Sequence, residues 1–141
     1  MDITTQAVAA TAPIHLKSAT GDLLYSNGDT SKPCRVIVYG PGSEQFAMIE
    51  SRQTSRVLKR MADNDGKPSA VPPIERNAER AEDLAAITVA FENFTYPPAA
   101  DKQGAELFQA FYADPKLGYM AQQVMKSVQD WGNFKPGSAG N

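Results

Sequence analysis

The chain has 141 residues, enough for one domain, and its single cysteine, Cys34, excludes an internal disulfide framework and a multi-cysteine zinc site. Its 14 basic and 16 acidic residues leave a formal charge of −2, which argues against nucleic-acid binding through a concentrated basic face. Leu, Ile, Val and Phe together make only 27 residues, about 19% of the chain, so we expect a thin core that a partner or a second copy completes.

Membrane and export signals are missing from the sequence as given. No apolar run approaches the roughly 18 residues of a membrane span. The segment Met1-Asp2-Ile3-Thr4 lacks the basic start and apolar stretch of a signal peptide. We therefore expect a soluble intracellular protein without a membrane partner.

The N-terminal part predicts strands. Residues 1–12 show no periodicity and predict a loose lead-in, so the single domain is expected over 13–134. Alternation over 14–19, a short return strand at 23–25 and the β-branched run 34–39 predict a small N-terminal antiparallel β element of two or three strands.

Helical periodicity begins after Gly40. Ser43 is a suitable N-cap for a helix that ends at the turn 63–66, and its apolar positions are Phe46, Ile49, Val57, Leu58 and Met61. Three prolines predict an exposed loop near 67–73.

A second helix is predicted over 75–94. Leu84, Ile87, Phe91 and Phe94 would share one face, and Arg76–Glu79 and Arg80–Asp83 have the spacing of surface pairs.

A short third helix would hold 107–112 and a last helix 117–131, followed by a flexible tail, 135–141. The predicted class is α+β, mostly helical, with three or four packed helices after the β element.

No constellation of residues predicts an enzyme, a metal site or a cofactor. The turn Gly40-Pro41-Gly42-Ser43 has the layout of a phosphate-binding loop, but Glu44 and Gln45 stand where a P-loop needs Lys and Ser or Thr. A tight strand-to-helix turn is the simpler interpretation. The acidic turn 63–66 lacks the outer ligands of a calcium loop. Cys34 is expected to be a small core residue, and the single histidine, His15, to be structural or exposed.

Arg52, Arg56 and Arg60 lie four residues apart and therefore share one face of the predicted helix. This basic stretch has two interpretations, a contact for an acidic partner or a solvated face that complements the helix C-terminus.

Nine of the 12 aromatic residues lie between residues 91 and 134. Aromatic side chains dominate both cores and interfaces. Helical spacing assigns Phe91, Phe94, Phe108, Phe111 and Trp131 to the core, and leaves Tyr96, Tyr112, Tyr119 and Phe134 as the better contact residues. The candidate partner-binding residues are Arg52, Arg56, Arg60, Phe91, Phe94, Tyr96, Phe108, Tyr112, Tyr119, Trp131 and Phe134.

The order of these segments resembles the tail assembly chaperones of long-tailed bacteriophages. The resemblance covers about residues 30–135 and rests on the strand and turn 36–43, the Arg-containing helix, the Ala-rich segment 84–91, and the closing segment 107–134 with its Phe111-Tyr112-Ala113-Asp114-Pro115-Lys116-Leu117 run. Phe91 stands where many relatives carry Trp, which is a departure from the family pattern.

The resemblance implies a non-enzymatic assembly factor in the cytoplasm of the infected host bacterium. Such proteins bind the tape-measure protein, recruit the major tail tube protein and often self-associate. The Ala-rich pattern of 84–112 is typical of a shallow groove for the apolar face of a client helix.

Two other classes stay open at this point. One is a structural virion protein, which is a minor tail, tail-completion or connector subunit that would stay in the finished particle. The other is a small enzyme or nucleotide binder that uses the turn Gly40–Ser43.

Overall fold

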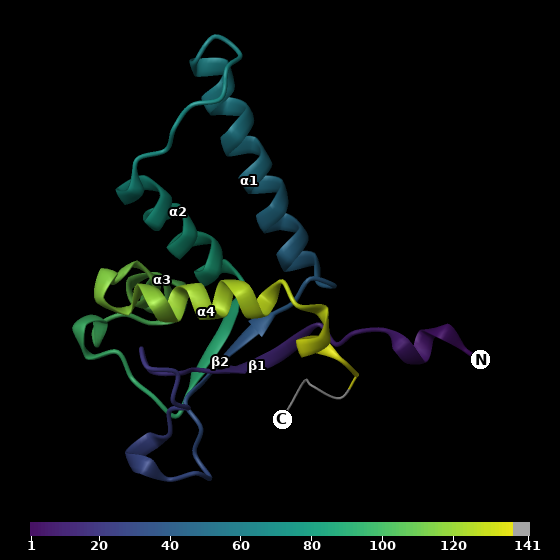
Figure 1. Cartoon of the computed structure of the whole chain (residues 1–141), viewed down its shortest axis with the longest axis vertical. Helices are drawn as coiled ribbons and strands as arrows, with labels where there is room; N and C mark the ends of the chain where they lie inside the picture. Colours follow the sequence, from purple (N-terminus) through teal and green to yellow (C-terminus); the bar gives the residue numbers. More distant parts are fainter. Residues whose placement is uncertain (137–141) are drawn as a thin grey trace.

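The computed structural model describes residues 1–136 and shows a three-stranded sheet with four helices (Figure 1). The strands β1 (Thr11–His15), β2 (Arg35–Tyr39) and β3 (Thr88–Glu92) are antiparallel and lie in the order β1-β2-β3. The helices are α1 (Glu44–Asp63), α2 (Pro73–Ala86), α3 (Gly104–Ala113) and α4 (Gly118–Val128). The expected α+β class is confirmed. Of the predicted tail 135–141, residues 137–141 lie outside the described part of the chain.

The core lies between one face of the sheet and the helices. Burial alternates along β1 and β2, so Ala12, Ile14, Val36 and Val38 point inward while their neighbours are only half-buried. The helices supply the other side of the core with Ala81, Leu84, Ala85, Phe111, Tyr112, Ala121, Val124 and Val128. Small alanines between larger side chains let these helices approach closely, so few large aliphatic residues suffice.

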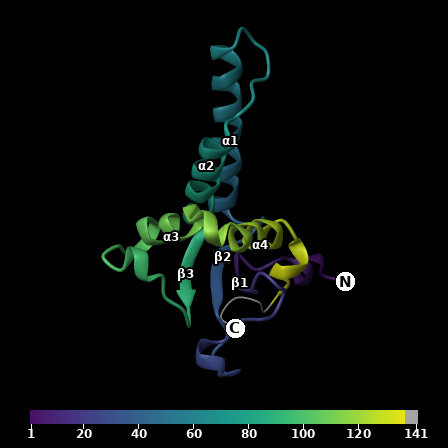
Figure 2. The same ribbon diagram turned by 60° about the vertical axis from the view of Figure 1, so that its left-hand side comes forward.

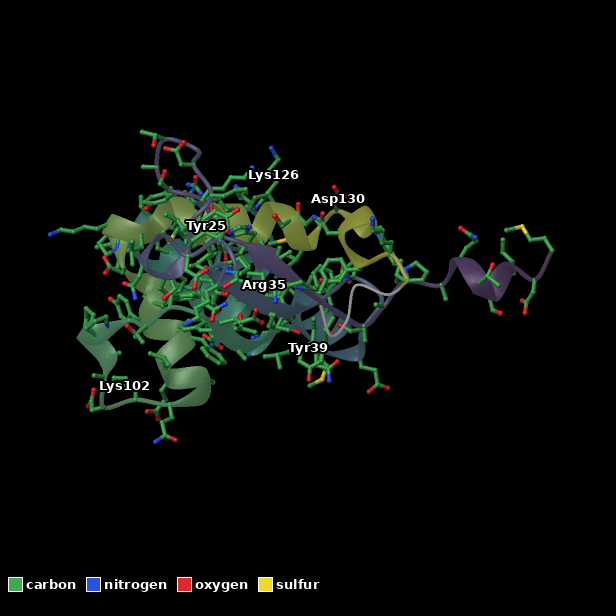
Figure 3. All side chains as sticks on the ribbon, turned by 90° about the horizontal axis from the view of Figure 1, so that it is seen from below. Tyr25, Arg35, Tyr39, Lys102, Lys126 and Asp130 are labelled. Atoms are coloured by element: carbon green, nitrogen blue, oxygen red, sulfur yellow. The ribbon has the colours of Figure 1, made fainter. Side chains whose placement is uncertain are left out.

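The opposite face of the sheet carries polar and aromatic side chains. Arg35 and Glu92 are cross-strand neighbours on β2 and β3 and form an ion pair. Figure 3 shows Arg35 and Tyr39 along β2 in the view from below. His15 Nε2 donates a hydrogen bond to the Leu24 carbonyl (2.7 Å), and the ring packs edge-on against Tyr25. His15 is half-buried at the end of β1.

The N-terminal strands differ in extent from the prediction. β1 begins at Thr11, inside the segment expected to be loose, and ends at His15. The return strand expected at 23–25 forms only isolated bridges, Lys17 with Leu23 and Tyr25 with Pro33. Asn27 and Gly28 have positive φ values of 52° and 72°, and this sharp turn interrupts a longer ladder.

The predicted helix over 75–94 is wrong in its second half. α2 ends at Ala86, and Thr88–Glu92 forms β3. Two contacts change the conformation there: the Ile87 carbonyl accepts a hydrogen bond from the Tyr39 amide (2.8 Å), and the Thr88 hydroxyl donates to the Leu84 carbonyl (2.7 Å). The run of β-branched residues fits the open edge of β2, so strand pairing overrides the helical spacing. The N-terminal element therefore supplies two strands and a later segment the third.

The predicted turn between β2 and α1 is confirmed. The Ser43 hydroxyl accepts a hydrogen bond from the Phe46 amide (3.2 Å) and so caps α1. Gly40 has a second requirement, because a Cβ atom at this position would lie 2.3 Å from the Phe134 ring. The tight turn therefore leaves space for an aromatic side chain, and Glu44 follows it at the first position of α1.

α1 and the connection that follows it extend away from the sheet, and α2 returns along the arm to pack against α3 (Figures 1 and 2). We call residues 44–86 the arm, and the sheet with α3 and α4 the body. α1 extends beyond the other helices, and its connection to α2 contains Pro68 and Pro72. Asp65 and Gly66 adopt positive φ angles and end α1 at the acidic turn, as predicted.

Candidate functional site: a cleft between the arm and the body

The arm exposes apolar side chains. Ile49 is the only buried residue within α1, while Met48, Val57 and Leu58 are 70%, 54% and 61% exposed. The apolar spacing had predicted that Val57 and Leu58 face a core. That prediction is wrong because α1 runs past the edge of the body, where its outer turns have no apolar partner.

A set of ion pairs joins α1 to α2. Arg52 and Arg56 both bind the Asp83 carboxylate, with Arg56 Nη1 2.8 Å from Asp83 Oδ2 and Arg52 Nη2 3.2 Å from Asp83 Oδ1. Glu82 also approaches both arginines, and Arg60 pairs with Glu79 one turn further along. We call these residues the arginine ladder: Arg52, Arg56, Arg60, Glu79, Glu82 and Asp83.

The arginine ladder contains three of the site residues that were predicted from the sequence. The three arginines share one face, as expected, but they turn toward the acids of α2 within the same chain. Asp83 is buried, and its oxygens also accept a hydrogen bond from Gln53 Nε2 (3.1 Å). The expected surface pair Arg80–Asp83 is therefore replaced by an interhelical one. Neither interpretation from the sequence, an acidic partner protein or a solvated face, included the acidic residues of α2 as the partners of these arginines.

Arg56 is the best-fixed member of the ladder. Burial alone would lower the pKa of its guanidinium, but the Asp83 hydrogen bonds and the acidic side chains around it outweigh burial and raise that pKa above its ordinary value. Arg52 contributes differently: its Nε and Nη2 atoms are buried without a well-formed hydrogen bond, so it acts through charge. Arg56 and Asp83 thus hold the two helices at the separation that long side chains allow.

A cleft of about 580 Å³ lies between α1, α2 and the C-terminal part of the body. Its apolar lining residues come from four parts of the chain: Phe46, Ile49, Val57, Leu84, Ile87, Met125, Val128 and Trp131. Ile49, Leu84, Ile87 and Val128 belong to the core, so the core itself forms the floor. Charged residues of the two arm helices stand around this apolar floor. Such a surface suits the apolar face of a partner and not a small polar substrate.

Trp131 lies at the body end of the cleft and is 55% exposed. Helical spacing had assigned it to the core of the last helix, and this assignment is wrong. α4 ends at Val128, and Trp131 belongs to a short 3-10 turn, Trp131–Phe134, capped by the Asp130 carboxylate. The turn reverses the two aromatics, so Trp131 faces the cleft while Phe134 is fully buried.

Phe134 and Tyr112 were expected to contact a partner, and the structure contradicts both expectations. Phe134 packs against Gly40 in the core, and its carbonyl accepts a hydrogen bond from the Ala9 amide (2.7 Å). The Tyr112 side chain is buried, and its hydroxyl lies 2.8 Å from the Thr88 hydroxyl. Both residues therefore stabilise the fold.

Five of the other predicted aromatics form one cluster, and they do not line the cleft: Phe91, Phe94, Tyr96, Phe108 and Phe111. Phe91 packs against Phe94, Phe108 and Phe111 with ring centroids 4.5, 4.7 and 5.1 Å apart. Tyr96 packs edge-on against Phe111, and its hydroxyl donates to the Asp114 carboxylate (2.8 Å). These rings pack against one another within the chain. Phe91 reaches the cluster from β3 and not from a helix. Tyr119 is half-buried beside a separate small hollow.

The cleft contains charged residues that the sequence analysis did not select. Arg76 and Arg80 of α2 and Glu50 of α1 line it. A signal for them exists in the sequence: Arg76 and Arg80 lie one helical turn apart, and the acids beside them are opposite the arginines of α1. The signal depends on knowing that α1 and α2 pack antiparallel, which the separate helix patterns do not show.

Within residues 1–136, His, Cys, Asp and Glu form no group of three or more that could hold a metal ion. No helix there has the length and apolar character needed to cross a bilayer. Cys34 is buried and its thiol donates to the Asn93 carbonyl (3.4 Å), and burial raises the pKa of that thiol. The expected burial of Cys34 is confirmed.

Comparison with known proteins gives no relative for this chain. No family model matches the sequence, and neither the curated proteins nor the solved structures contain a match. Function therefore has to be inferred from the cleft and the arm.

Proposed function

We propose that this protein is a phage tail assembly chaperone that binds helical segments of the tape-measure protein and helps to recruit tail tube subunits. The observation that carries the proposal is the cleft of about 580 Å³, which has an apolar floor and opens beside a protruding arm with exposed Met48, Val57 and Leu58. The order of strand, turn, arginine helix and aromatic C-terminal segment supports the same family.

The physical need of the client matches this surface. A long helical protein that will be enclosed in a tube exposes apolar faces until the tube forms. A chaperone has to cover those faces without the tight packing of a permanent complex. An apolar floor between two helices held by ion pairs offers contact area for a helix face, and the client can leave because the cleft is open to solvent.

Co-expression with the tape-measure protein of the same genome tests the proposal. We expect the full chain to increase the soluble fraction of the tape-measure protein and to be retained with it in a pull-down. Val57→Asp places a charge in the cleft and should reduce both effects. Ile74→Asp is the matched control, because Ile74 is 84% exposed on the arm and does not line the cleft. Unchanged solubility and no retention would contradict the proposal.

Mass spectrometry of purified particles separates the chaperone from a structural virion protein. A chaperone leaves before the tail is complete, so its peptides should be absent from finished virions. A stoichiometric amount in the particle would instead assign the chain to the minor tail, tail-completion or connector subunits, and would overturn the chaperone proposal.

A further inference from the structure

The two walls of the cleft carry opposite charges that no ion pair satisfies within residues 1–136. Four arginines and three acids line the cleft. Arg56 pairs with Asp83 and Arg60 with Glu79 in the arginine ladder. Arg76 and Arg80 on the α2 wall and Glu50 on the α1 wall are left over.

Arg80 is the most constrained of these residues. It is half-buried, it lines both the cleft and the small hollow beside Tyr119, and no acidic residue in the described chain forms an ion pair with it. A carboxylate is the strongest acceptor for a guanidinium, so the part of Arg80 that faces the cleft favours an acidic occupant. Arg76 lies one turn before Arg80 on α2 and is exposed, so both residues can meet carboxylates along the same wall.

The apolar floor between the two walls indicates the conformation of the occupant. Ile49, Leu84, Ile87 and Val128 present apolar side chains from helices and the start of β3, with no free sheet edge among the lining residues. An extended peptide gains affinity by adding to a sheet edge, whereas a helix gains it by laying an apolar stripe on such a floor. The one-turn spacing of Arg76 and Arg80 also matches two carboxylates one turn apart on a helix.

We propose that the cleft selects an amphipathic helix that carries a pair of acidic residues, one turn apart, beside its apolar stripe. The acidic pair lies against Arg76 and Arg80, the stripe covers the floor, and a basic residue on the opposite flank lies toward Glu50. The assignment of this helix to the tape-measure protein rests on the proposed function. The charge pattern itself rests only on the residues of the cleft.

Trp131 provides the measurement. It is the only tryptophan of the chain and lies in the cleft with 55% of its surface exposed, so an occupant should shift its emission to shorter wavelength. The probes are two capped, tryptophan-free helical peptides of about 18 residues with one leucine stripe. One carries Glu at the flanking one-turn positions, and the other carries Lys there.

We expect the Glu peptide to bind about tenfold more tightly than the Lys peptide at low salt. This preference should shrink as salt is added, because the charges are at the rim. Arg76→Glu should weaken the Glu peptide about threefold to fivefold and strengthen the Lys peptide. The substitution is compatible with folding, since Arg76 is exposed in the first turns of α2, where an acidic residue is favourable.

Lys59→Glu is the control for total charge. Lys59 is exposed on α1 and lies outside the cleft lining, so its reversal changes the net charge equally and should leave both affinities unchanged. Equal binding of the two peptides, or equal effects of the two variants, would overturn the acidic selectivity and leave the chaperone proposal standing. No Trp131 response to either peptide would overturn the cleft as a helix site, whatever the co-expression result. A response to the Glu peptide without any effect on the tape-measure protein would support the charge selectivity and contradict the proposed function.

Discussion

The body and the arm of this chain are stabilised in different ways. In the body, alternating strand residues, α3 and α4 enclose a core that includes fully buried Tyr112 and Phe134, and the C-terminal half of α2 packs onto it. In the arm, α1 buries only Ile49, and ion pairs between arginines and acids hold it against α2. Apolar contacts therefore fix the body tightly, whereas the arm depends on charges near solvent, which screen with salt and contribute less.

This difference explains how a chain with few large aliphatic residues can still fold. The scarce residues are concentrated in the body, and the arm is built with a small share of them. The exposed apolar residues of the arm are thereby available to a partner. The low content of Leu, Ile, Val and Phe therefore corresponds to a well-packed body and an arm with little core of its own.

The largest expected effect comes from the body. Phe134→Ala removes a fully buried ring that fills the space above Gly40, and it should lower the free energy of unfolding by about 3–5 kcal/mol. Urea titration followed by circular dichroism measures this loss. Trp131→Ala is the matched control three residues away, and its half-exposed ring should cost well under half as much. Equal losses would contradict the division between core and cleft.

An intermediate effect is expected in the arm. Asp83→Ala removes the shared carboxylate and leaves Arg52 and Arg56 near each other without it, which should cost about 1–2 kcal/mol because both guanidinium groups still reach solvent. Hydrogen exchange should become faster in α1 and stay slow in β2 and α4. Glu82→Ala, at a more exposed acid of the same ladder, should have a smaller effect. Uniformly faster exchange in the body would show that the arm is not a separate unit of stability.

The smallest effect concerns alkaline pH. Burial raises the pKa of the Tyr112 hydroxyl well above its ordinary value of 10.0, although the Thr88 hydrogen bond opposes the shift. Above about pH 10 the unfolded chain loses this proton first, so the free energy of unfolding should fall as pH rises toward the folded-state pKa. Tyr112→Phe should cost about 1 kcal/mol at neutral pH and reduce this alkaline loss.

Denaturation curves between neutral pH and pH 11 would test the Tyr112 prediction. Tyr96 contributes in the same direction, because its hydrogen bond to the Asp114 carboxylate raises its pKa, but its side chain is near solvent. Tyr96→Phe is therefore the control and should change the alkaline slope less. A steeper fall in the Tyr112→Phe variant than in the original chain would contradict the assignment.

Local signals in the sequence were sufficient for much of the fold. The Ser43 cap, the acidic turn after α1, the β-branched strand β2 and the buried stripe Met120, Val124 and Val128 all depend on neighbours within a few residues. The segment 88–92 could not be assigned this way. Its aromatics have helical spacing, and only pairing with β2, about 50 residues earlier, makes it a strand.

The candidate site was less predictable than the fold. Arg52, Arg56 and Arg60 were recognised as one face, but their acids belong to a different helix. Of the two aromatics in the last turn, Trp131 was assigned to the core and Phe134 to a contact, and the structure reverses both, because a 3-10 turn has a different side-chain period from the α-helix expected there. A cleft arises from helix packing, which no single periodic pattern contains.

The contact between Phe134 and Gly40 also has a consequence for synthesis on the ribosome. Phe134 fills the space above the turn before α1, and its carbonyl accepts a hydrogen bond from the Ala9 amide. The segments around Ala9 and Gly40 therefore gain these contacts only after residue 134 has been synthesised. The arm helices depend on residues 52–83 and can associate as soon as that stretch has left the exit tunnel. The body closes only after residue 134 emerges, because such a distant contact cannot form earlier. During translation β1 and β2 can pair first, the arm contacts can follow once residue 83 has emerged, and the contacts of Phe134 that close the body come last.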